Sequence, residues 1–176
     1  MKSVMLSIRP KWCEKIASGE KTIEVRKNKP KLETPFKCYI YCTSGRPDLN
    51  IPISPERLMQ DYLDTGSMQS LNCPLGNGKV IGEFTCDRIY GLAPLNHAPD
   101  DVEKQACLTR EEIVNYLKGT GYGWHIVGLR IYDQPRELSE FTGLRNTRFG
   151  AAPYDIKRPP QSWCYVEKWE KNDGDK

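Results

Sequence analysis

Histidine is nearly absent from this chain, since its 176 residues include only His97 and His125. Neither histidine has a serine or cysteine arrangement nearby that would form a catalytic triad. Long apolar runs are also missing, because none approaches the roughly 20 residues that a membrane-spanning helix needs. Residues 1–7 have too short an apolar stretch for a secretory signal and lack a cleavage-type sequence. We therefore expect a cytoplasmic protein without a membrane partner.

Cysteine pairs are missing as well, because the seven cysteines are an odd number and include no C-x-x-C motif. This usage argues against a disulfide framework and indicates a reducing compartment. Cys38 and Cys42 share one face of an expected strand, but the scarcity of histidine gives a zinc site little support. The glycines of segment 119–123 precede an expected strand rather than a helix, which argues against a phosphate-binding loop. We predict no metal site and no cofactor.

Positive charge is concentrated in the first quarter of the chain, although the formal net charge is only +3. Residues 1–46 contain eleven Lys and Arg against four Asp and Glu, whereas the remainder contains fifteen against nineteen. This asymmetry predicts one positive face on an otherwise slightly acidic protein. A solvated, lysine-rich surface would give the same pattern, so charge alone does not choose between the two.

The hydrophobic pattern predicts a mainly β, α+β fold without the regular alternation of a doubly wound sheet. Five or six strands are expected, over residues 4–8, 22–26, 36–43, 79–92, 124–132 and 163–169. Residues 44–79 are rich in Gly, Pro, Asn and Ser and predict an insertion with one short helix after Pro55, while 133–162 predict a long connection. We expect a single domain over 1–170 and a frayed tail over 171–176.

Two other helices are predicted from the residues at their ends. Pro10 suits the first turn of a helix over 10–18, and Gly19 suits its left-handed C-terminal cap. Residues 109–112, Thr-Arg-Glu-Glu, form a capping box at the start of a second helix that Gly119 ends. The side chains expected to face inward from this helix are Ile113, Tyr116 and Leu117.

Polar and apolar side chains alternate in the strand that follows Gly19. Thr22, Glu24 and Arg26 share its polar face, and Lys21 stands at its start. The two cations can bind a phosphate, while Glu24 can position them or accept a hydrogen bond from a base amino group. The alternative is an exposed strand face with cross-paired charges, worth under about 1 kcal/mol. Spacing alone favours this alternative.

The same spacing resembles the pattern of a known domain family. Gly19, Lys21, Glu24 and Arg26 form G-x-K-x-x-E-x-R directly after a strand and a short helix, as in the ASCH (activating signal cointegrator homology) domain family of PUA-like β-barrels. Weaker likenesses to later strands and to the closing motif of the longer, phage-like members occur at 79–84, 123–132 and 159–163. The resemblance implies a PUA-like, partly closed barrel of five to six strands with two or three peripheral helices.

The resemblance also implies a basic cleft that accepts RNA or a modified nucleotide. The helix over 10–18 and segment 19–26 bound this cleft, and Lys21, Glu24 and Arg26 become its polar lining. The residues expected beside its mouth are Arg9, Lys11 and Trp12. We therefore predict a nucleic-acid-binding module, without a choice between RNA and DNA.

A hydrolase is the alternative reading of the same residues. Some bacterial ASCH proteins that this chain resembles are amidohydrolases acting on 4-acetylcytidine, with a catalytic lysine, a threonine three residues later and a later glutamate. Lys21 matches, but Glu24 stands at the threonine position, and Thr22 lies too close to Lys21 to replace the hydroxyl. In a nucleoside hydrolase or ribonuclease, Glu24 would be the general base and Lys21 or Arg26 would stabilise the oxyanion, with Glu83 as a second acid. A protein-interaction adaptor using 44–79 is the remaining alternative.

A second basic segment with aromatic residues lies between Phe141 and Trp163. Its members are Arg145, Phe149, Tyr154, Arg148, Lys157 and Arg158. Bases stack on aromatic faces while cationic groups bind phosphates, so this mixture suits a single-stranded nucleic acid. The alternative is a structural loop whose aromatic side chains cover the end of the barrel.

Overall fold

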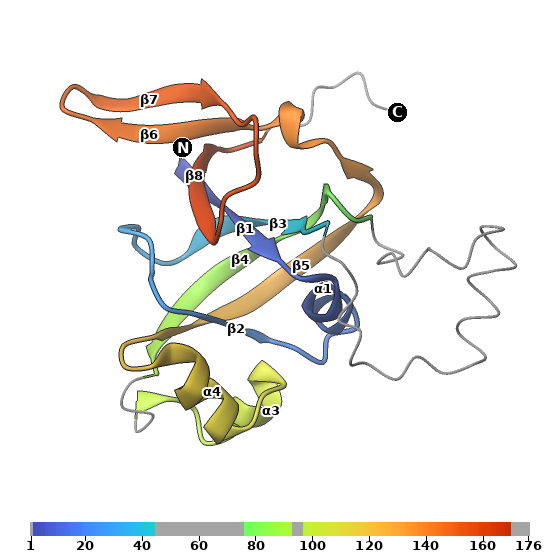
Figure 1. Ribbon diagram of the computed structural model, residues 1–176, viewed down its shortest axis with the longest axis vertical. Coiled ribbons are helices and arrows are strands. Elements are labelled where there is room, and N and C mark those ends of the chain that lie inside the picture. Colours follow the sequence, from blue (N-terminus) through green and yellow to red (C-terminus); the bar gives the residue numbers. More distant parts are fainter. Residues whose placement is uncertain (1, 45–75, 93–96, 170–176) are drawn as a thin grey trace, which may run out of the picture.

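The computed structural model describes residues 2–44, 76–92 and 97–169. Eight strands of this part form one strongly curved sheet in the order β2-β5-β4-β3-β1-β8-β6-β7, with the helices on its outside (Figure 1). The strands are β1 (Lys2–Ile8), β2 (Ile23–Arg26), β3 (Phe36–Cys42), β4 (Lys79–Gly91), β5 (Tyr122–Arg136), β6 (Thr142–Thr147), β7 (Gly150–Asp155) and β8 (Trp163–Glu167). The helices are α1 (Pro10–Ala17), α3 (Val102–Ala106) and α4 (Arg110–Leu117), with a 3-10 turn η2 (Leu138–Glu140).

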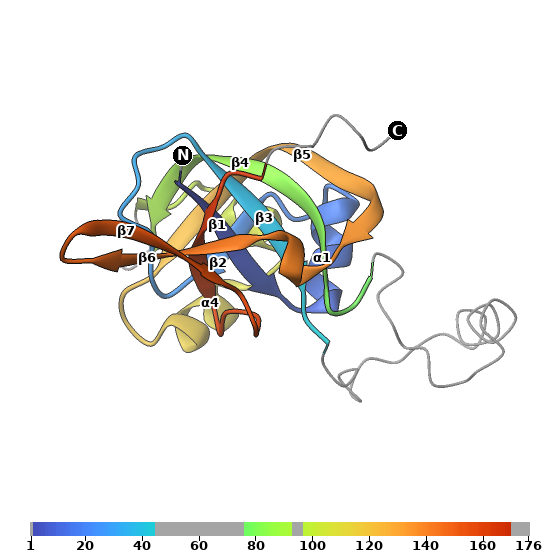
Figure 2. The ribbon, with the colours of Figure 1, turned by 90° about the horizontal axis from the view of Figure 1, so that it is seen from above.

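This mainly β architecture with few helices confirms the predicted fold class. The strand count of five or six is too low, because the predicted connection over 133–162 is wrong. Strand β5 continues to Arg136, and β6 and β7 form a hairpin that projects from the body of the sheet (Figure 2). Pro153 suggests a loop in the sequence, yet β7 is the last strand of the sheet, where a missing N–H is tolerated.

Strands β1 and β3 lie in the middle of the sheet and bury both of their faces. Val4 and Leu6 belong to one core cluster together with Cys38 and Ile40, whereas Met5 between them belongs to another cluster on the opposite face. These two strands pair in parallel, and β1 pairs antiparallel with β8. Burial on both faces explains why their sequences are nearly continuous apolar runs.

The residues at the helix ends act as predicted. Helix α1 begins at Pro10, and Gly19 beyond its end has a left-handed φ of 79°. In α4, the Glu112 N–H donates to Thr109 Oγ1 at 3.2 Å, and the Thr109 N–H donates to Glu112 Oε2 at 2.8 Å. Helix α4 ends at Leu117, two residues before Gly119, because Lys118 already has a φ of 51°.

Several expectations fall on residues that the structure does not describe. The insertion predicted over 44–79 lies almost wholly within the undescribed segment 45–75, and the tail over 171–176 also lies outside. The short helix α3 was not predicted from the sequence. No helix in the described part of the chain is long and apolar enough to span a membrane.

Gly82 provides a test of the contact between β4 and β5. A Cβ at this position would lie 2.5 Å from the backbone oxygen of Arg130, whereas a Cβ at Gly91 in the same strand meets no atom within 4 Å. We expect Gly82→Ala to lower the free energy of unfolding by about 1–3 kcal/mol, because the two strands must separate to admit the methyl group. Gly91→Ala is the matched control and should unfold like the wild type. Equal urea midpoints for the two variants would contradict this account of the contact.

Candidate functional site

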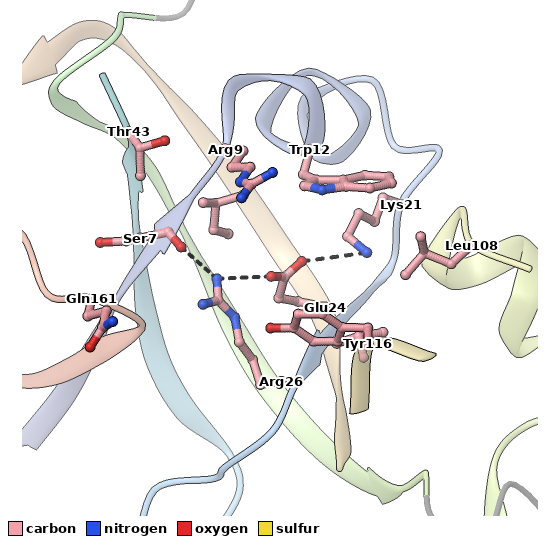
Figure 3. Close-up of a pocket in the computed structure, with 12 residues that line it drawn as sticks. Ser7, Arg9, Trp12, Lys21, Glu24, Arg26, Thr43, Leu108, Tyr116 and Gln161 are labelled. Carbon is pink, nitrogen blue, oxygen red and sulfur yellow. Dashed lines mark hydrogen bonds and ion pairs between the residues drawn. The ribbon is translucent and has the colours of Figure 1, made fainter. Parts of the chain in front are cut away.

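A cavity of about 440 Å³ opens between the end of β1, helix α1, strand β2 and helix α4 (Figure 3). Its floor is built from β2, the short strand that the sequence singled out. Ile23 and Val25 of β2 pack into the core cluster that includes α3 and α4. Because side chains alternate along a strand, Glu24 and Arg26 point to the other side, into the cavity.

Glu24 lies between two cations at the floor of this cavity. Its Oε1 is 2.9 Å from an Arg26 guanidinium nitrogen, and its Oε2 is 3.5 Å from Lys21 Nζ (Figure 3). All three side chains are buried, with 2% of Lys21 and 6% of both Glu24 and Arg26 exposed. The prediction that these three residues would meet at one site is therefore consistent with the structure, and the exposed strand face is wrong. We call these residues the charged triad.

Lys21 connects the charged triad to two helices. Its Nζ donates a hydrogen bond of 2.8 Å to the Ala106 carbonyl oxygen at the end of α3. The same nitrogen lies 5.1 Å from the centre of the Trp12 ring, on α1. The indole face supplies a second favourable electrostatic contact for the buried ammonium group. Lys21 therefore has a fixed position between the two helices.

Arg26 connects the charged triad to the end of β1 and to the segment before β8. It donates a hydrogen bond of 2.8 Å to the carbonyl oxygen of Ser7 at the end of β1, and bonds of 3.2 Å to both the carbonyl oxygen and Oγ of Ser162. Its Nε is buried and has no hydrogen-bond partner among the described residues. Two cations and one carboxylate leave the triad with a net charge of +1 and one unused donor, so its electrostatic field favours an acceptor-rich or anionic ligand.

Aromatic and polar side chains form the walls above the charged triad. Figure 3 shows Trp12 and Tyr116 on either side of the Glu24 carboxylate, with Arg9 next to Trp12. Lys11 lies outside the cavity, with its Nζ 4.7 Å from the Trp12 ring centre. The predicted neighbours of the mouth are therefore present, with Arg9 and Trp12 in the lining.

Sequence reasoning missed several residues of the lining. The residues not predicted to line it are Ser7, Ile8, Thr43, Leu108, Tyr116 and Gln161. Tyr116 was expected to face the core with Ile113 and Leu117, but 47% of it is exposed. A helix of 3.6 residues per turn places only Ile113 and Leu117 on the inward line, and Tyr116 lies to one side of it. The position of Tyr116 relative to Ile113 and Leu117 was the one sequence signal that could have placed its ring outside the core.

The second basic segment lies away from the cavity. Arg145 and Arg148 belong to the β6–β7 hairpin, and Lys157 and Arg158 follow β7; all four are exposed, and none lines the cavity. At the hairpin tip, the Arg148 guanidinium lies 4.5 Å from the ring centre of Phe149, which is 86% exposed. Phe141, in contrast, is 3% exposed and belongs to the core. Phe141 is therefore a structural residue and not a stacking surface for a base.

Glu83 lies outside the cavity and is not a second acid there. Its carboxylate pairs with Lys37 Nζ at 2.7 Å and accepts a hydrogen bond of 2.8 Å from the Tyr132 hydroxyl. Burial raises the pKa of the Glu83 carboxyl, but the hydrogen bonds from Lys37 and Tyr132, with the charges of Lys37 and Arg130, hold the pKa below its ordinary value. This arrangement fixes Glu83 as an ionised structural residue between β3, β4 and β5.

Both the N-terminal third of the chain and its whole fold are similar to known proteins. A model of the ASCH domain family matches residues 6–65, a span that includes the end of β1 and all of α1, β2 and β3. The crystal structure of ASCH from Zymomonas mobilis is similar at 18% identity and a TM-score of 0.53, covering 94% of this chain and 88% of that one. A mutant of the same Zymomonas mobilis protein is similar at 17% identity and a TM-score of 0.53, covering 96% and 92%. No curated protein matches. The structural likeness shows a shared fold.

Removing the charge of Glu24 tests whether the charged triad supports the fold. Glu24→Gln leaves two buried cations without their shared counter-ion, so we expect the free energy of unfolding to fall by about 3–5 kcal/mol. Glu20→Gln is the matched control, because Glu20 pairs with Lys15 at 2.9 Å on the surface and should contribute almost nothing. Chemical denaturation of both variants measures the difference. A Glu24 variant as stable as the Glu20 variant would contradict the structural role.

The lowered pKa of Glu83 predicts a pH-dependent contribution to stability. A group whose pKa is lower in the folded state stabilises the protein above its ordinary value of 4.5, and this stabilisation is lost as the pH falls through the folded value. Glu83→Gln should therefore cost about 1–3 kcal/mol near neutral pH. The difference from the wild type should shrink steadily below pH 4.5. Urea unfolding at several pH values measures it, and a constant difference would contradict the prediction.

Proposed function

Because this chain belongs to the ASCH domain family, we propose that it binds RNA or a modified nucleotide and takes one nucleotide of a single strand into the cavity above the charged triad. The observation that supports this most is a polar, net-positive floor between two aromatic side chains, Trp12 and Tyr116. A volume of about 440 Å³ is within the range of small-ligand sites. The polar groups of the floor are already fixed by hydrogen bonds, so binding requires little reorganisation.

The proposed recognition uses both halves of a nucleotide. The flat faces of Trp12 and Tyr116 offer stacking surfaces for a base. A carboxylate has about four acceptor positions, so Glu24 can bind Lys21 and Arg26 and still accept a hydrogen bond from a base amino group. Arg9 and Lys11 at the mouth are suited to the phosphates of the same strand.

The geometry favours binding over hydrolysis. A general base must accept a proton from water, but each oxygen of Glu24 is already paired with a cation, at 2.9 Å and 3.5 Å. Taking up that proton would leave the two buried cations without their shared counter-ion, which is costly. Lys21 is held in the same way by Ala106 and Trp12. We therefore assign Lys21 and Glu24 to recognition in this proposal, and a turnover assay decides between the two roles.

The exposed cations of the second basic segment complete the proposed surface. Arg145, Arg148, Lys157 and Arg158 lie on and after the β6–β7 hairpin, away from the charged triad. In this proposal they contact the phosphates of a strand that extends beyond the cavity, and they do not touch a single bound nucleotide. A mononucleotide therefore tests the cavity alone.

Tyr116 provides the test of the cavity. We expect Tyr116→Leu to weaken the binding of ribonucleoside monophosphates by about 5- to 150-fold, since base stacking contributes about 1–3 kcal/mol. The substitution removes a half-exposed ring and should leave the fold intact. Phe149→Leu, which removes an exposed ring at the hairpin tip, is the matched control and should bind like the wild type. Isothermal titration calorimetry measures both variants.

The outcomes separate the alternatives. Equal affinities for the Tyr116 and Phe149 variants, or no binding of any mononucleotide by the wild type, would remove the support for the cavity as a nucleotide site. Incubation of the wild type with 4-acetylcytidine and with single-stranded RNA, followed by chromatography, tests turnover. Release of acetate or cleavage of the RNA would contradict the binding proposal and support the hydrolase alternative.

A further inference from the structure

Three exposed lysines follow directly after β2, at every second position. Lys27 lies with its Nζ 5.3 Å from the ring centre of Tyr116, and Lys29 lies with its Nζ 5.1 Å from the ring centre of Tyr122. Lys31 is the third, and its backbone N–H donates a hydrogen bond of 2.8 Å to the hydroxyl of Tyr165 on β8. Each lysine of this run therefore stands beside a different tyrosine, although the three tyrosines come from three separate elements.

A fourth lysine continues this row towards the β6–β7 hairpin. Lys2 Nζ lies 5.4 Å from the ring centre of Tyr165 and donates a hydrogen bond of 2.9 Å to Asn146 on β6. Tyr165 thus contacts both Lys2 and the backbone of Lys31. Figure 1 shows the segment between β2 and β3 rising along the side of the molecule, from the region of α4 towards the level of the hairpin.

The orientation of the lysines is fixed by their apolar neighbours. Pro30 is buried, and Leu32 packs against the core. Lys29 precedes Pro30 and Lys31 lies between Pro30 and Leu32, so both lysines point to solvent. Glu33 is the one acidic residue between positions 27 and 35. Part of the positive charge of the first 46 residues therefore lies in one net-positive row at the surface.

We propose that Lys27, Lys29, Lys31 and Lys2, with Tyr116, Tyr122 and Tyr165, form a track for an extended single-stranded nucleic acid that leads from the cavity to the β6–β7 hairpin. This inference rests on the proposed function, because the track starts at Tyr116, which also lines the cavity. A nucleotide bound in the cavity places the next phosphate of its strand at Lys27. We call these seven residues the Lys–Tyr track.

The chemistry of the track fits a single strand in two respects. Residues two apart along a chain are separated by at most about 7 Å, which is comparable to the distance between neighbouring phosphates of an extended strand. Lys27 and Lys29 are exposed, and a cation–π contact at an exposed site contributes only about 0.5–1 kcal/mol, so their ammonium groups can turn to a phosphate at little cost. The ring of Tyr116, which is 47% exposed, is then available to a base. Three of the four lysines, Lys2, Lys27 and Lys29, have their ammonium groups next to a tyrosine ring, which a solvated lysine face would not require.

The number of lysines on the track predicts the salt dependence of binding. Each phosphate neutralised on a single strand contributes about −0.7 to the slope of log K against log salt. The triple variant Lys27→Gln, Lys29→Gln, Lys31→Gln should therefore bind a labelled oligonucleotide of about eight nucleotides with a slope shallower by about 2. Its affinity at low salt should fall by roughly 100-fold. Fluorescence anisotropy with RNA and with DNA of the same sequence measures both quantities.

A matched control separates the track from net charge. Lys104→Gln, Arg130→Gln and Lys168→Gln remove three exposed cations that belong to neither the cavity nor the track. This triple variant has the same net charge as the track variant and should keep a slope close to that of the wild type. Equal slopes for the two triple variants would overturn the track.

Four comparisons distinguish the track from the cavity and from another partner. Unchanged mononucleotide affinity in the track variant supports a track separate from the cavity. A shallower salt dependence of oligonucleotide binding in the track variant supports the track. If the wild type binds no mononucleotide, this result still supports the track, and only the cavity proposal is refuted. Wild-type affinity for the oligonucleotide no higher than for a mononucleotide overturns the track. Binding of labelled poly-glutamate in place of the oligonucleotide also overturns it, in favour of an acidic protein partner.

Discussion

The arrangement of the cavity depends on one buried carboxylate that lies between two buried cations. Glu24 neutralises part of the charge of Lys21 and Arg26, and without it the short strand β2 would carry two unpaired charges inside the protein. The two cations in turn bind backbone carbonyls of neighbouring elements. Lys21 binds the end of α3, and Arg26 binds the end of β1. The charged triad at the floor therefore connects two walls of the cavity.

Such a cluster is an inefficient way to stabilise a fold. Desolvation of each ion costs several kcal/mol, and apolar side chains of similar volume often give equal or better stability. The charged triad also leaves one buried donor, Arg26 Nε, without a partner among the described residues. Buried polar groups with incomplete pairing are characteristic of sites that complete their hydrogen bonds with a ligand. The energetic disadvantage of the triad is thus consistent with selection for recognition rather than for stability.

Much of the fold could be predicted because its determinants are local. Proline at the start of α1, glycine after it and the capping box of α4 act within a few residues, and all three are present as predicted. The β6–β7 hairpin was missed because edge position, which makes Pro153 acceptable, is a property of the whole sheet. For the site, the spacing of Lys21, Glu24 and Arg26 predicted a surface, and only the family resemblance predicted a cleft. The burial of Lys21, Glu24 and Arg26 depends on contacts with α1, α3 and the segment before β8. The sequence around β2 does not reveal these contacts.

The contacts of Arg26 join parts of the chain that are synthesised far apart in time. Ser7 lies 19 residues before Arg26, and Ser162 lies 136 residues after it. Strand β1, near the start of the chain, also sits between β3 and β8 in the sheet, so its second edge stays open until β8 arrives. Pairing over such long separations delays folding, because the loop must close before the contact forms. Arg26 therefore acquires its full set of partners late, and a nascent chain on the ribosome holds an unfinished cavity until the last strand has docked.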